Sequence, residues 1–357
     1  MRVLFLQQQP CVRTLKYAVA LRDARPDIVL GFAFQGQTLS GWYGTGDDLF
    51  DRWWRLGPEP SADRERVTAD FGPDLVHSHN LPDSLTVLAK EICGDRTPVV
   101  HDVHDLQSVR RTPYEAGFPE PADPLTLERQ AVEGSAAVVA VSAEMLAEME
   151  ARHAVPDRRL RFANYALGRD LPNELPPPDR PREGPFRAVY QGTLSTNGGH
   201  YDLRDIFRAI VAGGVRLDVY PGRPAPAYEE LAAATPGMRC HETLPPGKLL
   251  EVLPTYDFGW AGFNAALNGP HLDTALPNKA FEYVGCGLPV LTLGHRALAR
   301  LVTEEGVGVS LDRLDDLDAQ LQELDVVGLR RRAAEVRTGF TVEAHVGRLV
   351  ELYEAVA

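Results

Sequence analysis

Short apolar runs with strand character alternate with helical segments along most of the chain, and this alternation constrains the fold more than any other feature. Segments with helical character, such as residues 12–26 and 83–95, separate the runs. The runs of the first half are RVLFLQ, DIVLGFAF, DLVHSHN, PVVHDVHDL and AAVVAVS. Strands that alternate with helices predict an α/β fold with a parallel sheet.

A proline-rich stretch at residues 171–185 interrupts this alternation and predicts a linker, because its composition is too stiff and polar for a helix or strand. The alternation then resumes in FRAVYQGTL, VRLDVYPG, MRCHETL, YDFGWAGF, LPVLTLG and GVGVSL. A chain of 357 residues is long enough for two domains. We therefore expect two doubly wound, Rossmann-like domains that face a cleft, at residues 1–170 and 186–340, and a final helix within residues 341–357 that packs back on the first domain.

Composition narrows the partners and the compartment. The net charge of −13 argues against nucleic acid, and it allows at most a peripheral contact with membranes. No apolar run approaches the roughly 18 residues of a membrane span, and MRVLFLQQQP turns polar too soon for a signal peptide. The four cysteines lack CxxC spacing, which is typical of free thiols in a reducing compartment. These features predict a cytoplasmic protein.

The segment LPNKAFEYVGCGLPVLTLG, residues 276–294, is the most specific signal. Pro277 suits the first turn of a short helix that two glycines end before an apolar strand. In that helix Asn278, Lys279 and Glu282 lie near one another. The helix start and the lysine favour a phosphate, and the glutamate can accept hydrogen bonds from ribose hydroxyls. An exposed Lys/Glu pair on an ordinary helix remains the alternative.

Two histidine-rich strand ends mark the first half. In HDVHDL the alternation of a strand places Asp102 and His104 on one face and His101 on the other. HSHN offers His79 and Asn80 at a second strand end. The alternative is that these polar residues only cap the strands. We predict no metal site, because the histidines lack the carboxylate or cysteine companions of a dedicated one.

With these motifs the chain resembles glycosyltransferase family 4, a retaining family with the GT-B fold, in its branch with an NKxFEY-type motif. LPNKAFEYVGCGLPVLT looks like the donor-binding signature of that family. Four further stretches match in order: DLVHSHN, PVVHDVHDL, AVVAVSAEM and AVYQGTLS. The resemblance spans residues 70–292.

The resemblance implies that the second domain binds a nucleotide-sugar donor, with Glu282 on the ribose. Eight positions earlier, where relatives often carry a glutamate, this chain has Thr274. Residues 192–203 resemble the phosphate-gripping loop but lack the Arg and Lys of many relatives, so a plain glycine-rich turn is the alternative. The expected donor-binding residues are Gly192, Thr193, Asn197, Gly198, Gly222, Arg223, Pro277, Asn278, Lys279 and Glu282.

For the first domain the resemblance implies the acceptor side and a catalytic histidine. His104 matches the family's "HD" histidine beside the reacting sugar and, with Lys279, is an expected catalytic residue. The expected acceptor-side residues are Gln9, Arg13, His79, Asn80 and Asp105. Trp53 and Trp54 suggest a core helix, with a stacking platform for an acceptor or a membrane-facing lip as alternatives. The tryptophan segment and residues 105–124 together are the candidate region for acceptor recognition.

The resulting hypothesis is a hexosyltransferase-like enzyme that moves a sugar from a nucleotide-sugar to a hydroxyl of a small-molecule, glycan or lipid-linked acceptor. The family implies retention of configuration, with the leaving diphosphate assisting the acceptor, and no cofactor or metal. Two alternatives stay open. One is a non-catalytic GT-B subunit that binds a partner protein, and the other is a GT-B sugar-nucleotide epimerase or C–N coupling enzyme.

Overall fold

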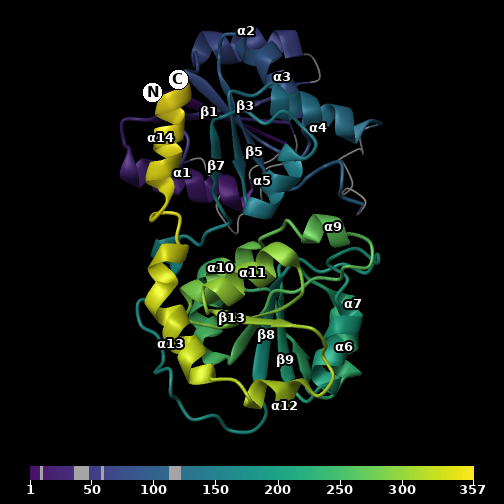
Figure 1. Cartoon of the computed structure of the whole chain (residues 1–357). Helices are drawn as coiled ribbons and strands as arrows, with labels where there is room; N and C mark the ends of the chain where they lie inside the picture. Colours follow the sequence, from purple (N-terminus) through teal and green to yellow (C-terminus); the bar gives the residue numbers. More distant parts are fainter. Residues whose placement is uncertain (9–10, 36–47, 58–59, 112–121) are drawn as a thin grey trace. The chain divides into compact units, whose positions relative to one another are not determined.

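The computed structural model describes the chain except residues 9–10, 36–47, 58–59 and 112–121 (Figure 1). It divides into two compact units. The first comprises Met1–Ala163 and Val342–Ala357, and the second comprises Asn164–Thr341. Each unit contains one sheet in which every pair of neighbouring strands is parallel. The predicted α/β class with two doubly wound sheets is confirmed.

The first unit is built on a seven-stranded sheet in the order β3-β2-β1-β4-β5-β6-β7. Its strands are β1 (Arg2–Gln7), β2 (Val29–Phe34), β3 (Arg52–Arg55), β4 (Leu75–His79), β5 (Val99–Val103), β6 (Ala137–Ala140) and β7 (Arg159–Arg161). Its helices are α1 (Val12–Ala24), α2 (Pro60–Asp70), α3 (Ser84–Cys93), α4 (Pro124–Glu133), α5 (Ala143–Glu150) and α14 (Val346–Val356). The strand order reverses between β1 and β4, and sheets of this kind bind ligands at the carboxyl ends of the strands beside such a reversal.

The second unit is built on a six-stranded sheet in the order β10-β9-β8-β11-β12-β13, which reverses between β8 and β11. Its strands are β8 (Arg187–Gly192), β9 (Arg216–Pro221), β10 (Met238–Cys240), β11 (Phe258–Trp260), β12 (Val290–Leu293) and β13 (Gly308–Leu311). Its α-helices are α6 (Arg204–Ala212), α7 (Pro226–Ala233), α8 (Pro246–Val252), α9 (Gly269–Leu272), α10 (Asn278–Gly285), α11 (Arg296–Glu304), α12 (Leu317–Gln322) and α13 (Val326–Val336). Three short 3-10 helices complete it, η2 (Gly168–Asp170), η3 (Leu253–Thr255) and η4 (Arg337–Phe340).

The central strands are buried on both faces of their sheets, and strands of this kind have the continuous apolar sequences seen in the predicted runs. All residues of β4, β5 and β6 are buried, and so are Val3 to Leu6 of β1. In the second unit Phe207 of α6 and Trp260 of β11 are fully buried in one apolar cluster. The polar residues on the buried strands therefore need partners inside the first unit, and these partners build the candidate site described below.

The proline-rich residues 171–185 lie wholly within the second unit, so the division between the units does not fall there. Their carbonyls are used by that unit: Arg337 donates a hydrogen bond to Pro172 O, and Arg330 donates one to Pro178 O at 3.4 Å. Residues 171–185 therefore pack on the second unit, although their composition excludes a helix or a strand.

The two tryptophans lie on a strand, and the predicted core helix is wrong. Residues 52–55 form β3, the edge strand of the first sheet, where Trp54 pairs with Ala33 of β2. Trp54 is buried against Phe71, and Trp53 packs against Phe32. Aromatic side chains suit a half-buried pleated surface, which explains why this segment pairs as a strand.

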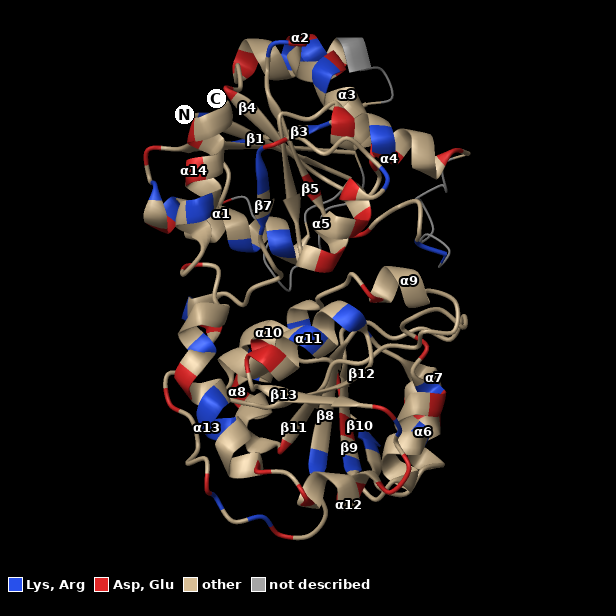
Figure 2. Ribbon diagram, in the orientation of Figure 1, with Lys and Arg blue, Asp and Glu red and all other residues tan. Residues whose placement is uncertain are grey.

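The last helix, α14, belongs to the first unit. Its Tyr353 is fully buried and shares a hydrogen bond of 2.5 Å with Nδ1 of His77. Acidic and basic residues are interspersed over the ribbons of both units (Figure 2). In the part of the chain that the structure describes, no helix combines the length and apolar character needed to cross a membrane.

Candidate active site

Lys279 places a buried ammonium group in the second unit. Helix α10 begins after Pro277, whose extended backbone (φ −73°, ψ 145°) makes it the N-cap. The Lys279 side chain is 7% exposed, and its Nζ lies 4.0 Å from the ring centre of Tyr190 and 5.3 Å from that of Phe263. Among the residues that the structure describes, none is a hydrogen-bond partner of Nζ. Burial lowers the pKa of Lys279 to about 7, against a smaller opposing effect of Glu282.

Gly192 leaves room beside this ammonium. It ends β8 with φ +123°, a backbone conformation that favours glycine. A Cβ at this position would lie 3.6 Å from Nζ of Lys279. Gly222 closes the neighbouring turn, since its N–H donates to Gly192 O at 2.9 Å. The glycine thus keeps side-chain atoms away from the lysine at the end of β8, next to the reversal of strand order, where sheets of this kind bind ligands.

Glu282 lies one turn further along α10 and is half-buried. Its Oε2 accepts a hydrogen bond of 2.5 Å from Nε2 of Gln191. The backbone N–H of Gln191 in turn donates to Tyr283 Oη at 3.1 Å. Gln191 is not among the predicted site residues. Its position next to the glycine at the end of a predicted strand is the signal that points to it.

The remaining predicted donor residues lie in loops of the second unit, except Asn278, which begins α10. Asn197 is exposed, and its Oδ1 accepts hydrogen bonds from Gly199 N at 3.0 Å and from Ser195 Oγ at 2.9 Å. Gly198 donates its N–H to Asp202 Oδ2 at 3.0 Å. These contacts shape the 192–203 loop from within. The other members are Thr193, whose carbonyl accepts from Tyr190 Oη, exposed Arg223, and Asn278 at the first position of α10.

Thr274 stands where relatives often have a glutamate, and it is fully buried. Its Oγ1 donates a hydrogen bond of 2.8 Å to His271 O, directly after α9. This hydroxyl stabilises the end of a short helix within the unit. The carboxylate beside Lys279 is thus supplied by Glu282 of α10.

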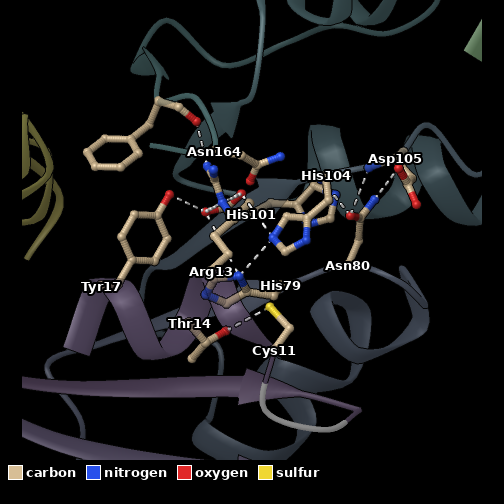
Figure 3. A network of polar contacts seen from close by, with 12 residues as sticks. Cys11, Arg13, Thr14, Tyr17, His79, Asn80, His101, His104, Asp105 and Asn164 are labelled. Atoms are coloured by element: carbon tan, nitrogen blue, oxygen red, sulfur yellow. Dashed lines mark hydrogen bonds and ion pairs between the residues drawn. The ribbon is translucent and has the colours of Figure 1, made fainter. Parts of the chain in front are cut away.

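In the first unit, Asn80 brings two strand ends together (Figure 3). It follows β4, and its Oδ1 accepts a hydrogen bond of 2.8 Å from the backbone N–H of His104, which follows β5. Its Nδ2 donates to Asp105 O at 2.6 Å. Asn80 is 2% exposed, so these bonds replace lost water contacts and fix the turn. The Asp105 side chain pairs with Arg110 at 3.0 Å.

His79 and His104 form a hydrogen-bonded imidazole pair. Nδ1 of His79 lies 3.0 Å from Nε2 of His104, and Oδ1 of Asp102 lies 3.5 Å from the same Nε2. His79 is fully buried, whereas one fifth of the His104 side chain is exposed. Burial lowers the pKa of His104 to about 4, although Asp102 opposes it, and burial also holds the pKa of His79 well below its ordinary value. Both rings are therefore neutral near pH 7.

Asp102 anchors this pair from within the core. Burial alone would raise its pKa, but the Arg13 guanidinium and a hydrogen bond from His77 hold it well below the ordinary value. Arg13 contacts both carboxylate oxygens at 3.2 Å, and Tyr17 Oη donates at 2.8 Å. His101 lies on the opposite face of β5, and its Nδ1 shares a 2.8 Å hydrogen bond with a threonine of α3. The predicted alternation of faces is confirmed.

The structure thus gathers four of the predicted acceptor-side residues and His104 at the carboxyl ends of β4 and β5. Arg13 lies deeper than the others, at 4% exposure, and also donates to the carbonyls of Phe162 and Ala163. Gln9 and part of the predicted acceptor region, residues 112–121, lie outside the described residues. Cys11, which is not among the predicted site residues, joins the group (Figure 3).

Comparison with known proteins gives one family match and several structures with the same fold. The family profile described as Glycosyltransferase Family 4 matches residues 45–163. A glycosyltransferase from Rickettsia africae is similar in structure with a TM-score of 0.71 at 10% identity, covering 99% of this chain and 98% of that one. Sucrose-phosphate synthase from Thermosynechococcus elongatus gives 0.69 at 14% identity, with 99% of each chain covered.

The fold is GT-B. A further GT-B structure, Anabaena HepE in complex with UDP and glucose, gives a TM-score of 0.69 at 14% identity, covering 99% of this chain and 100% of that one. The resemblance to glycosyltransferase family 4 is confirmed. A comparison with curated protein sequences gives no match. The GT-B fold and the family match together support sugar transfer as the general activity.

Proposed function

We propose that this protein transfers a sugar from a nucleotide-sugar donor to an acceptor hydroxyl with retention of anomeric configuration. The observation that carries the proposal is the buried ammonium of Lys279. It has no hydrogen-bond partner among the described residues, and it lies beside Gly192 at the end of β8. An unpaired buried cation is costly, and a diphosphate seated there would compensate it.

The second unit would hold the nucleotide through two side chains of α10. Lys279 would bind the diphosphate, and Glu282, already oriented by Gln191, would accept hydrogen bonds from the ribose hydroxyls. Both side chains start from one short helix whose buried face includes Phe281 and Tyr283. This rigid support favours a defined distance between the ribose and the phosphate contact.

His104 would act from the first unit as a hydrogen-bonding group. With a pKa of about 4 its ring is a weak base near neutral pH, so it is poorly suited to take a proton outright. In the proposed reaction the bond between the sugar C1 and the diphosphate oxygen breaks, and the acceptor oxygen bonds to C1 on the same face. The acceptor proton passes to the departing phosphate oxygen. Lys279 stabilises the charge on that phosphate, and we propose that no metal cofactor is required.

The proposal is tested by a thermal-shift screen of nucleoside diphosphates and nucleotide sugars, followed by product analysis with the donors that bind. A ligand of the folded state raises the apparent stability by mass action. We expect a stabilising nucleotide sugar and a glycosylated product with the donor's configuration. Binding without product would favour the non-catalytic subunit, and conversion of the donor alone would favour an epimerase.

Replacing Glu282 by alanine should weaken nucleotide affinity by about 1.5–3 kcal/mol for each charged hydrogen bond lost, while the fold survives. The dissociation constant is measured by calorimetry. Glu251→Ala is the matched control, because Glu251 is an exposed glutamate on α8 of the same unit. Equal affinities of the Glu282→Ala and wild-type proteins would exclude Glu282 from ribose binding.

Donor binding should take up a proton at pH 8 through Lys279. With a pKa of about 7 this amine is mostly neutral at pH 8, and a bound diphosphate raises its pKa, so most of one proton is taken up at pH 8 and much less at pH 6. A nucleotide sugar is the ligand, because its diphosphate has no oxygen that titrates near neutrality. Calorimetry in buffers of different ionisation enthalpy measures the uptake, which should vanish in Lys279→Met. Uptake that persists in this variant would assign the proton to another group.

A further inference from the structure

Three potential metal ligands from distant parts of the sequence meet in the first unit. The Sγ of Cys11 and one ring nitrogen each of His79 and His104 all lie within 4.8 Å of one another. Cys11 is the residue before α1, His79 ends β4, and His104 follows β5 (Figure 3). The group therefore sits at the carboxyl edge of the sheet, beside the reversal between β1 and β4.

The chemistry of these three donors selects a class of ion. A thiolate with two neutral imidazoles suits Zn²⁺ and other thiophilic transition metals, and it disfavours Mg²⁺ and Ca²⁺, which prefer oxygen ligands. Three protein ligands leave a fourth tetrahedral position for water. The cysteine companion that the sequence analysis found lacking beside the histidines is thus supplied by the chain after β1.

The two imidazole nitrogens are already close to the separation that a metal site needs, and their rings would have to turn toward a shared ion. Nδ1 of His79 and Nε2 of His104 are 3.0 Å apart, whereas two nitrogens bound to tetrahedral zinc lie about 3.3 Å apart, given Zn–N bonds of about 2.0–2.1 Å. Cys11 is partly exposed, and its Sγ lies 3.4 Å from Thr14 Oγ1. Binding an ion would therefore break only this weak hydrogen bond of the thiol. The buried carboxylate of Asp102, 3.5 Å from His104 Nε2, adds negative charge next to the position of the ion.

A second group, His77, His79 and Asp102, also lies within 4.8 Å but is closed to an ion. All three side chains are fully buried. Asp102 is engaged by Arg13 and Tyr17, and His77 by the tyrosine of α14. An ion there would have to displace a buried guanidinium, which leaves the Cys11 group as the accessible one.

We propose that Cys11, His79 and His104 bind a thiophilic divalent ion of the Zn²⁺ class and that the bound ion inhibits the protein. Binding replaces the thiol proton and the hydrogen bond between the two imidazoles with metal–ligand bonds, and one proton is released from the thiol. The ion occupies Nε2 of His104, so that nitrogen no longer interacts with substrate. The inhibition rests on the proposed role of His104, whereas the binding does not.

Binding is tested with Co²⁺ on the chelator-treated full chain in a non-thiol reductant. Coordination by Cys11 should produce a thiolate-to-cobalt charge-transfer band in the near ultraviolet, which Zn²⁺ then abolishes by competition. Cys11→Ser should lose the band, and its affinity for Zn²⁺ should fall by more than about 10-fold. Even the loss of a residue that only supports a metal ligand lowers affinity by about that factor. Cys93→Ser is the matched control, since Cys93 is another free, partly exposed cysteine of the same unit, on α3. A missing wild-type band, or one that survives in Cys11→Ser, overturns the site.

Inhibition is tested by glycosyl transfer at increasing Zn²⁺. The wild type and Cys93→Ser should lose activity over the range of Zn²⁺ concentration in which Zn²⁺ displaces Co²⁺. Each rate is expressed as a fraction of the same protein's metal-free rate. On this scale, Cys11→Ser should need a Zn²⁺ concentration more than about 10-fold higher for the same inhibition. A band with unchanged transfer overturns the inhibition and counts against the role of His104, while the ion site stands. If no donor supports transfer, the proposed function fails, and the cobalt band still decides the ion site.

Discussion

Replacing His104 by alanine should lower kcat by about 10²–10³-fold, the loss expected when one positioned hydrogen-bonding group that acts on the transition state is removed. The Kd of the nucleotide donor should stay unchanged, because the proposed nucleotide contacts, Lys279 and Glu282, belong to α10 of the other unit. The turn at His104 is held by the hydrogen bond from its backbone N–H to Asn80, which alanine keeps. The substitution removes only the ring and its hydrogen bond with His79. Steady-state kinetics and calorimetry measure the two quantities.

His101→Ala is the matched control for this prediction. His101 lies on β5, three residues before His104 and on the face of the strand opposite Asp102, and it is hydrogen-bonded to Thr86 of α3, so its loss should affect stability rather than kcat. The pH profile adds a second readout. A ring with a pKa of about 4 stays neutral from pH 6 to 8, so kcat should show no inflection from His104 there, and protonation reduces activity only as the pH falls toward 4. Near-normal turnover of His104→Ala would reduce this residue to a strand-end cap.

The central strands could be predicted from the sequence, whereas two edge strands could not. Every predicted apolar run contains a strand, and the central strands give the clearest signal because strands covered on both faces require continuous apolar residues. The missed strands are β3 (RWWR) and β7 (RLR), the two edges of the first sheet. Edge strands are exposed along one side, so arginines are tolerated there and the apolar signal is lost.

The candidate site was predictable where it depends on strand ends. Asn80 and His104 follow neighbouring strands of a parallel sheet, and the carboxyl ends of such strands meet at one edge. The direction of Arg13 was not predictable, since helix position alone does not reveal that its guanidinium enters the core to meet Asp102. Cys11 was missed for a similar reason, because its approach to His79 and His104 depends on how α1 enters the sheet.

Replacing Lys279 by methionine should lower turnover by about 10²–10³-fold, the loss expected when one group that stabilises developing charge is removed. Its ammonium is the buried cation beside the end of β8, and the 192–203 loop contributes no Lys or Arg of its own. The bare nucleoside should bind almost as before, because it lacks the phosphates that the amine contacts. Affinity for diphosphate ligands should fall, as measured by calorimetry.

The same substitution should raise the melting temperature of the ligand-free protein. Methionine keeps the aliphatic contacts with Tyr190 and Phe263, and it removes a buried charge that no described residue compensates by a hydrogen bond. In the wild type, the pKa of Lys279 falls from 10.5 to about 7 on folding. The unfolded chain therefore binds the extra proton between these pH values, and this group's contribution to stability increases as the pH rises from 7 to 10.5. The gain in stability of Lys279→Met over the wild type should consequently be largest at pH 7 and below, and it should shrink as the pH rises above 7.

A gain in stability together with a loss of turnover distinguishes a functional lysine from a structural one. A lysine that supports the fold would give a lower melting temperature when replaced, and its effect on turnover would follow the loss of folded protein. Lys248→Met is the matched control, because Lys248 is an exposed lysine of the same unit, paired with Glu251 on α8, and it should change neither quantity. Equal losses for nucleoside and diphosphate ligands, or a lower melting temperature in Lys279→Met, would contradict the phosphate role. The combination of signs expected here arises only if the protein retains an unfavourable buried charge for a ligand that neutralises it.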